Sequence, residues 1–185
     1  MYEQKWYTEG AHAKRFRITR EFLLEHEPSP ARILDLGIEN PMGKIMAEMG
    51  HEVVNTAGRD FDYFPEEAAM EGFEVATAFE ILEHMVSPLP VLAKIKAPVL
   101  YASVPLDLWF LKAYRGNLDP YDQHYHEFED WQFDLLLEKS GWRITHSKKW
   151  AAGAVKPGIR PILRFFTDRY YLVRAERVSF PLPEG

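Results

Sequence analysis

Four side chains that can carry a proton lie in two short segments of the sequence. Glu83 and His84 are adjacent, and His124 and His126 are separated by one residue. Because a histidine titrates close to neutral pH, each of the three could take a proton from a hydroxyl or an amine. We therefore predict His84, His124 and His126 as candidate catalytic residues.

The same histidines also have the composition of a metal site. Alternating residues of an extended segment point to one face, which suits metal ligands. Asp119, Asp122 and His84 could complete a set with His124 and His126 that needs no cysteine. Proton transfer and metal binding are both open on these residues alone.

The segments that must position these residues alternate between strands and helices. Apolar runs predict strands over residues 32–37, 51–56, 72–79 and 98–105, followed by an antiparallel pair over 142–150 and 169–178. Helical spacing predicts helices over 10–27, 44–50 and 127–140. In the first helix, the charged residues Lys14 and Arg15 are expected to face outward. This alternation indicates an α/β domain with a mostly parallel sheet.

The composition limits the class of protein and its partners. The chain has 185 residues and no cysteine, so we expect a single domain over 1–185 and exclude disulfide frameworks and cysteine nucleophiles. With 22 basic and 28 acidic residues the net charge is −6, which disfavours nucleic acid as a partner. No stretch could span a bilayer and no secretory signal is recognisable, so we expect a cytoplasmic monomer or homodimer without a membrane partner.

Three groups of segments, taken in order, resemble the class I S-adenosylmethionine-dependent methyltransferases, most closely their compact small-molecule branch. Residues 33–37, Ile-Leu-Asp-Leu-Gly, are similar to the first strand and the start of the glycine loop of that family. Residues 73–84, which end in Glu-Ile-Leu-Glu-His, are similar to its fourth strand. The segments at 103–105, 124–128, 135–137 and 140–142 are similar to its fifth strand and the passage into the sixth. The resemblance covers residues 31–146.

The resemblance implies a Rossmann-like methyltransferase fold and S-adenosylmethionine as the cofactor. The expected sheet is mostly parallel and twisted, with an antiparallel C-terminal strand and helices on both faces. Residues 1–30 would form an N-terminal helical lid, 31–146 the core and 147–185 the final strands. Because few residues separate Thr56 from Val75, we expect a lost or shortened helix and a rudimentary third strand after the second strand.

The same resemblance implies where the cofactor binds, at the carboxyl ends of the strands. Asp35 and Gly37 would meet its amino acid part, and Phe79 and Glu80 would pack against its adenine side. Asn55 stands where the family usually has an acid for the ribose hydroxyls. The predicted cofactor-binding residues are Asp35, Gly37, Glu39, Asn40, Gly43, Asn55, Phe79 and Glu80.

The glycine loop departs from the family pattern of Gly-x-Gly-x-Gly. Glu39 and Pro41 stand at its second and third glycine positions. Proline has no N–H and a fixed φ, so the loop cannot make the usual contacts. Glu39 would either bind the methionyl ammonium or block the pocket. A second hypothesis is therefore a binding or regulatory protein that kept the fold and lost the cofactor.

The predicted activity is methyl transfer from S-adenosylmethionine to a small molecule. This reaction depends on alignment and on exclusion of water, so a general base is optional. The resemblance implies a loop anchor at the His124 segment, and on that basis we predict no metal. Aromatic residues near the N-terminus and in the loop before residue 126 are candidates for substrate binding; they are Trp6, Tyr7, Trp109 and Tyr125.

Overall fold

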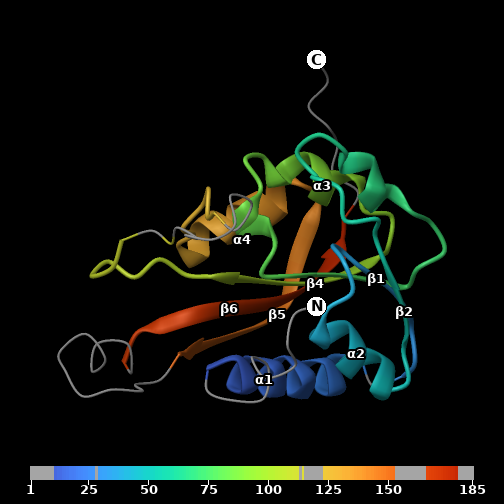
Figure 1. The fold of residues 1–185 in the computed structure, drawn as a ribbon, viewed down its shortest axis with the longest axis horizontal. Coiled ribbons are helices and arrows are strands. Elements are labelled where there is room, and N and C mark those ends of the chain that lie inside the picture. Colours follow the sequence, from blue (N-terminus) through green and yellow to red (C-terminus); the bar gives the residue numbers. More distant parts are fainter. Residues whose placement is uncertain (1–10, 28, 113, 115–122, 153–165, 179–185) are drawn as a thin grey trace.

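The computed structural model describes residues 11–27, 29–112, 114, 123–152 and 166–178, whose six strands form one sheet in the order β2-β1-β3-β4-β6-β5 (Figure 1). The strands are β1 (Arg32–Asp35), β2 (Glu52–Asn55), β3 (Val75–Phe79), β4 (Val99–Pro105), β5 (Trp142–Ala151) and β6 (Asp168–Arg177). β1 to β4 are parallel to one another, and β6 runs antiparallel to both β4 and β5. The predicted mixed sheet is confirmed.

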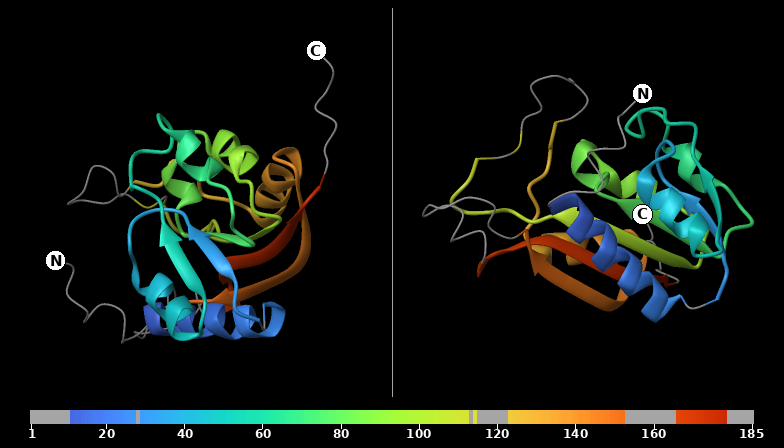
Figure 2. Two further views of the ribbon diagram at one scale, coloured as in Figure 1. Left: turned by 90° about the vertical axis from the view of Figure 1, so that its right-hand side faces the viewer. Right: turned by 60° about the horizontal axis from the view of Figure 1, so that its bottom comes forward.

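Helices cover both faces of the sheet. They are α1 (Ala11–His26), α2 (Pro41–Glu48), α3 (Pro88–Lys94) and α4 (Asp130–Lys139), with short 3₁₀ helices η2 (Pro65–Ala69) and η3 (Leu82–His84). Figure 2 shows α1 along one face of the sheet, with α3 and α4 on the opposite face. Successive side chains of a strand point to opposite faces of the sheet, so neighbouring residues pack against different helices. Ile33 belongs to the apolar cluster of Phe22 in α1, whereas its neighbour Leu34 belongs to the cluster of Phe133 in α4.

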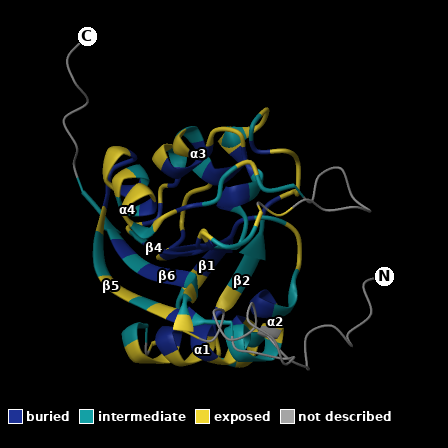
Figure 3. Ribbon diagram, turned by 90° about the vertical axis from the view of Figure 1, so that its left-hand side faces the viewer, coloured by how far each residue is buried: buried dark blue, intermediate teal, exposed yellow. Residues whose placement is uncertain are grey.

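The helix α1 is an integral part of the core. Phe22 and Leu23 are buried in the cluster that also holds Met46 of α2 and Tyr101 of β4. Figure 3 shows buried and exposed residues alternating along α1 and α4, and the central strands β1, β3 and β4 between them are mostly buried. None of the helices in the described ranges is long and apolar enough to cross a membrane.

The segment between β2 and β3 is shortened, as expected. Residues 56–74 contain the 3₁₀ helix η2 and no strand, so β1 pairs directly with β3. Pro65 begins η2, where a missing N–H costs no hydrogen bond. The carboxyl end of β2 is therefore followed by a loop that stays at the edge of the sheet.

The helix α2 begins three residues before the predicted start at Lys44. Asn40 is its N-cap, and the Asn40 side-chain oxygen accepts hydrogen bonds from the backbone N–H groups of Met42 and Gly43. Pro41 occupies the first helical position, which needs no donor. The proline that interrupts the glycine pattern thus starts a helix.

The helix α3 is not predicted from the sequence, because two prolines lie within its seven residues. Contacts from distant segments hold its ends. The Asp62 carboxylate accepts hydrogen bonds from the backbone of Val86 and Ser87, at 2.7 and 2.8 Å. At the other end, the Arg177 guanidinium of β6 donates to the carbonyl oxygen of Leu92 at 3.3 Å. Tertiary contacts therefore stabilise a helix that its local sequence does not favour.

Candidate functional site

Two cavities lie at the edge of the sheet where β1, β2, β3 and β4 end. The larger has a volume of about 790 Å³ and is lined by residues 37–38, 58–63, 81, 84–86 and 125. The smaller has a volume of about 180 Å³ and is lined by residues 15–16, 19, 40–42, 79–80 and 103. The larger volume falls in the usual range for small-molecule sites, and this edge is where ligands bind in open parallel sheets.

Asp35 connects the elements behind the two cavities. Its Oδ1 accepts a hydrogen bond from the Thr77 hydroxyl at 2.6 Å. Its Oδ2 accepts from the side-chain amides of Asn40 at 2.7 Å and Asn55 at 3.0 Å. Burial raises the pKa of Asp35, and the three hydrogen bonds oppose that shift. The carboxylate therefore joins the ends of β1, β2 and β3 to the start of α2.

Two glycines allow the loops after β1 and β2 to approach each other. Gly37 has a φ of 104°, and its N–H donates to the Thr56 hydroxyl at 2.9 Å. Gly58 has a φ of 77°, and a Cβ at that position would overlap the side chain of Ile38. Gly37, Ile38 and Gly58 together form part of the wall of the larger cavity.

The predicted cofactor residues fall into three groups. Gly37, Asn40, Phe79 and Glu80 line the cavities. Asp35, Gly43 and Asn55 are not among the described lining residues; Asn55 bonds to Asp35, and a Cβ at Gly43 would lie 3.4 Å from Asp35 Oδ2. Glu39 has a side chain that is 73% exposed and pairs with Lys44 Nζ at 3.2 Å. It neither fills nor lines the described cavities.

Glu80 has an unusual backbone conformation at the end of β3. Its φ of 52° is rare for a residue with a side chain and often accompanies a functional site. Glu80 Oε1 accepts from the Ser103 hydroxyl at 2.8 Å, and Oε2 pairs with Arg15 Nη1 at 3.0 Å. The side chain of Arg15 is only 19% exposed, so the prediction that it faces outward is wrong. It lines the smaller cavity instead.

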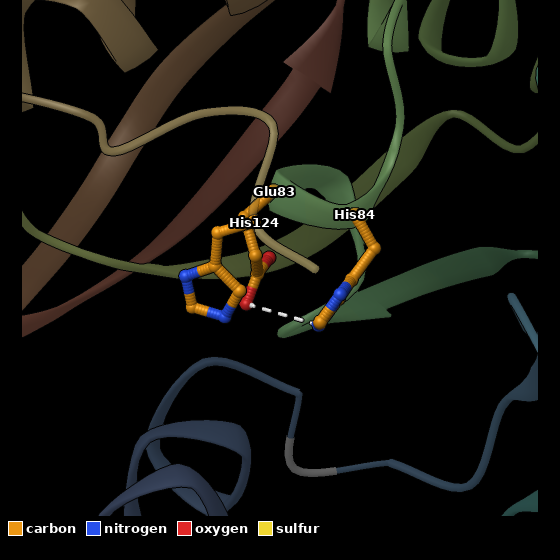
Figure 4. A group of neighbouring side chains, drawn as sticks. All are labelled: Glu83, His84 and His124. Carbon is orange, nitrogen blue, oxygen red and sulfur yellow. Dashed lines mark ion pairs between the residues drawn. The ribbon is translucent and has the colours of Figure 1, made fainter. Parts of the chain in front are cut away.

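Glu83, His84 and His124 meet beside the larger cavity (Figure 4). The backbone N–H groups of Tyr125 and His126 donate to the Glu83 carbonyl oxygen at 2.8 and 3.3 Å, which holds the histidine segment against η3. The rings of His84 and His124 have centroids 4.9 Å apart. Burial, and next the charge of Glu80, raise the pKa of Glu83 well above its usual value.

His126 lies in the same segment but has different contacts. Its Nε2 is 3.2 Å from the carbonyl oxygen of Val86, and its ring stacks on Phe128 with centroids 5.3 Å apart. These contacts are those of a loop anchor. Of the three predicted catalytic histidines, the structure brings His84 and His124 together.

The predicted substrate-binding residues are spread over the molecule. Tyr125 lines the larger cavity. Trp109 is 76% exposed, contacts the ring of Phe110 and is not among the described lining residues. Trp6 and Tyr7 lie outside the described residues.

Several lining residues are missed by the sequence analysis. Arg15, Thr19 and Ser103 line the smaller cavity, and Ile38 lines the larger one. Arg15 and Thr19 are one turn apart on α1, but a helix facing a cavity has the same pattern as one facing solvent. Ser103 lies inside a strand whose neighbours are all apolar, and that isolated hydroxyl is the one signal available.

No protein-family model matches the chain, and no curated protein matches its sequence. Solved structures match its fold over most of its length. The 1,6-didemethyltoxoflavin-N1-methyltransferase of Burkholderia thailandensis, solved with 1,6-didemethyltoxoflavin and S-adenosylhomocysteine, has a TM-score of 0.63 and 17% identity. The match covers 95% of this chain and 82% of that one.

Two further structures share the fold at lower similarity. A SAM-dependent methyltransferase from Archaeoglobus fulgidus has a TM-score of 0.56 and 13% identity, covering 88% of this chain and 94% of that one. The [4+2]-cyclase SpnF has a TM-score of 0.56 and 13% identity, covering 93% of this chain and 85% of that one. The chain therefore has the fold of the class I methyltransferases, and that fold also occurs in an enzyme named for another reaction.

Proposed function

We propose that the protein binds S-adenosylmethionine and transfers its methyl group to a small molecule. The observation that carries the proposal is the pair of cavities on either side of the loop after β1, at the carboxyl edge of a methyltransferase-type sheet. A structural neighbour is described with S-adenosylhomocysteine bound, which supports the same cofactor class here.

The two cavities differ in the chemistry of their walls, which supports an assignment of the cofactor's two halves. Arg15 and Glu80 in the smaller cavity carry the charges that complement an amino acid carboxylate and ammonium. Ile38 and Ile81 in the larger cavity present apolar surface suited to a nucleoside base. The bound cofactor supplies the electrophilic methyl group, and the chain supplies alignment and exclusion of water.

His84 and His124 are the proposed groups for the proton of the methyl acceptor. His84 lines the larger cavity, and His124 lies beside it with Nδ1 3.1 Å from Glu127 Oε1. A histidine oriented by a carboxylate can accept a proton near neutral pH. The cavity volume and the net charge of −6 support a small acceptor over a nucleic acid.

One observation favours the alternative, a non-catalytic protein of the same fold that serves as a binding or regulatory module. Both carboxylate oxygens of Asp35 already have partners within the chain, and Glu39 pairs with Lys44 at the surface. Asp35 and Glu39 thus have other contacts, and so does Glu80, whose carboxylate accepts from Ser103 and pairs with Arg15. This alternative predicts a folded protein with no affinity for the cofactor.

Calorimetry with S-adenosylhomocysteine separates the two proposals. We expect binding of one ligand per chain, and we expect Glu80→Gln to weaken it about tenfold or more because a charged hydrogen bond is worth about 1.5–3 kcal/mol. Glu39→Gln, on the exposed side of the same region, is the matched control and should bind like the parent. Absence of heat at millimolar ligand with folded protein would overturn the enzyme proposal. Equal binding by Glu80→Gln would overturn the assignment of the smaller cavity.

A further inference from the structure

Three side chains with metal-binding atoms converge beside the larger cavity. One ligand atom from each of Glu83, His84 and His124 lies within 4.8 Å of the other two. In the view of Figure 4 the Glu83 carboxylate lies between the two imidazole rings. We propose that these three residues bind one divalent first-row transition-metal ion.

The Glu83 carboxylate is buried and has an oxygen atom available to bind a cation. It is 1% exposed, and its Oε2 has no hydrogen-bond partner among the described residues. Its Oε1 lies 3.9 Å from His84 Nε2. A buried carboxyl oxygen without a hydrogen-bond partner is costly, and a bound cation would offset that cost.

Both imidazole rings are oriented through their other nitrogen atom. His84 Nδ1 lies 3.0 Å from the carbonyl oxygen of Gln123, and His124 Nδ1 lies 3.1 Å from Glu127 Oε1. A nitrogen that faces such an oxygen carries the proton, so Nε2 keeps the lone pair that a metal requires. Metal-binding histidines have this arrangement almost without exception.

The nearby positive charges have acidic partners of their own. Arg15 pairs with Glu80 at 3.0 Å, and Arg169 lies 3.5 Å from Glu127 Oε2. Neither guanidinium is paired with Glu83 among the described ion pairs. No arginine of the described ion pairs therefore occupies the place of the ion beside the Glu83 carboxyl group.

The donor set selects the class of ion. Two imidazoles and one carboxylate suit zinc, cobalt, manganese or iron in the divalent state. Magnesium and calcium prefer oxygen ligands, and copper(I) prefers the sulfur of cysteine or methionine. Zinc-type bonds of about 2.0–2.2 Å place ligand atoms about 3–3.5 Å apart. Side-chain rotations that move each ligand atom by about 1 Å would bring the three atoms to that spacing.

The position of the site gives the ion a role that rests on the proposed function. Three protein ligands leave at least one coordination position open. His84 lines the larger cavity, so an oxygen or nitrogen of a bound acceptor could occupy that position. With the ion bound, both Nε2 atoms are ligands, so the ion takes the place of the histidines as the group that promotes proton loss: it would orient the acceptor and lower the pKa of its reacting group.

Cobalt(II) is the probe of choice because its ligand-field absorption reports the coordinating atoms. Chelator-treated protein should bind one Co²⁺ per chain, with Zn²⁺ displacing it and Mg²⁺ failing to do so at the same concentration. Glu83→Gln and His124→Gln should each weaken binding by about 100-fold or more, the upper end of what loss of an outer-sphere partner costs. His84→Gln, on a partly exposed side chain, provides a third variant should another fail to fold.

Controls separate this site from nonspecific binding by histidine. His146→Gln removes an exposed histidine of β5 and should leave Co²⁺ affinity unchanged. His126→Gln should also retain binding, because His126 contacts Val86 rather than the cluster. Absence of one-to-one binding by the parent, or equal affinity in parent and Glu83→Gln, would overturn the proposal. So would a loss in His126→Gln as large as that in His124→Gln. The titration needs no methyl acceptor or cofactor, so its failure is distinguishable from failure of the proposed function.

Discussion

Two buried carboxyl groups at the same edge of the sheet have opposite environments. Asp35 accepts three hydrogen bonds from the chain, whereas Glu83 has an oxygen without a described partner. A fully bonded buried acid stabilises the elements that it joins, and one with an unbonded oxygen is costly unless it binds a ligand. At the residue scale, Asp35 therefore joins the elements around it, and Glu83 is the residue that we propose binds a ligand.

We expect Asp35→Asn to lower the free energy of unfolding. An amide has one acceptor oxygen, so its NH2 group would face either the Thr77 hydroxyl or the amide donors of Asn40 and Asn55. At least one buried donor loses its partner, which costs about 1–3 kcal/mol. Urea denaturation measures the change. Glu39→Gln, an exposed residue of the same loop, should stay within about 0.5 kcal/mol of the parent. Equal stability of the two variants would show that the Asp35 contacts contribute nothing.

At the scale of elements, one arginine of β6 terminates two helices. Arg177 donates to the carbonyl oxygens of Leu92 near the end of α3 and of Ser140 at the end of α4, at 3.3 and 3.0 Å. Its guanidinium also lies 4.1 Å from the ring centroid of Trp142. The last carbonyl groups of a helix have no partner within it, and a cation there satisfies them. The final strand thus stabilises a helix that its own sequence disfavours.

We expect Arg177→Met to destabilise the protein by about 2–3 kcal/mol, because it removes charged hydrogen bonds to partly buried carbonyl groups. Arg143→Met is the matched control. Arg143 is on the adjacent strand, its side chain is 67% exposed, and it pairs with Glu176 at the surface. That change should cost less than about 0.5 kcal/mol. Thermal and urea unfolding measure both, and similar losses in the two variants would contradict the role of Arg177.

At the scale of the whole molecule, Tyr101 lies at the centre of the sheet and joins it to α1. It is fully buried on β4, and its ring packs edge-on against Phe22 with centroids 6.1 Å apart. Burial, and next the charge of Glu27, raise the pKa of Tyr101 to about 12 from an ordinary value of 10.0. The folded state therefore disfavours the ionised form.

The sign of this shift predicts a loss of stability in alkali. The contribution of Tyr101 is fully present below pH 10 and is lost as the pH rises from 10.0 toward about 12. The loss is on the order of 2 kcal/mol. Tyr101→Phe keeps the packed ring and removes the titrating hydroxyl, so its unfolding free energy should fall less over this range. Parallel pH profiles for parent and variant, measured by urea denaturation, would contradict the prediction.

The sequence by itself determines the order and type of most elements, because the information for them is local. The alternation of apolar residues predicts the strands, and the short segment between Thr56 and Val75 predicts a reduced connection there, although the structure has no strand in it where a rudimentary one was expected. The spacing of histidine and glutamate residues also identifies the two segments that carry Glu83, His84 and His124. The spacing of apolar residues along a helix or strand does not depend on which elements it finally packs against.

Only the tertiary structure decided which of these residues meet. Arg15 pairs with Glu80 across 65 positions of sequence, and backbone hydrogen bonds from residues 125 and 126 to Glu83 bring His124 beside it. The helix α3 depends on Asp62 and Arg177 in the same way. A contact between distant side chains leaves no periodic pattern in either segment, because its energy arises only after the sheet has brought both to one edge.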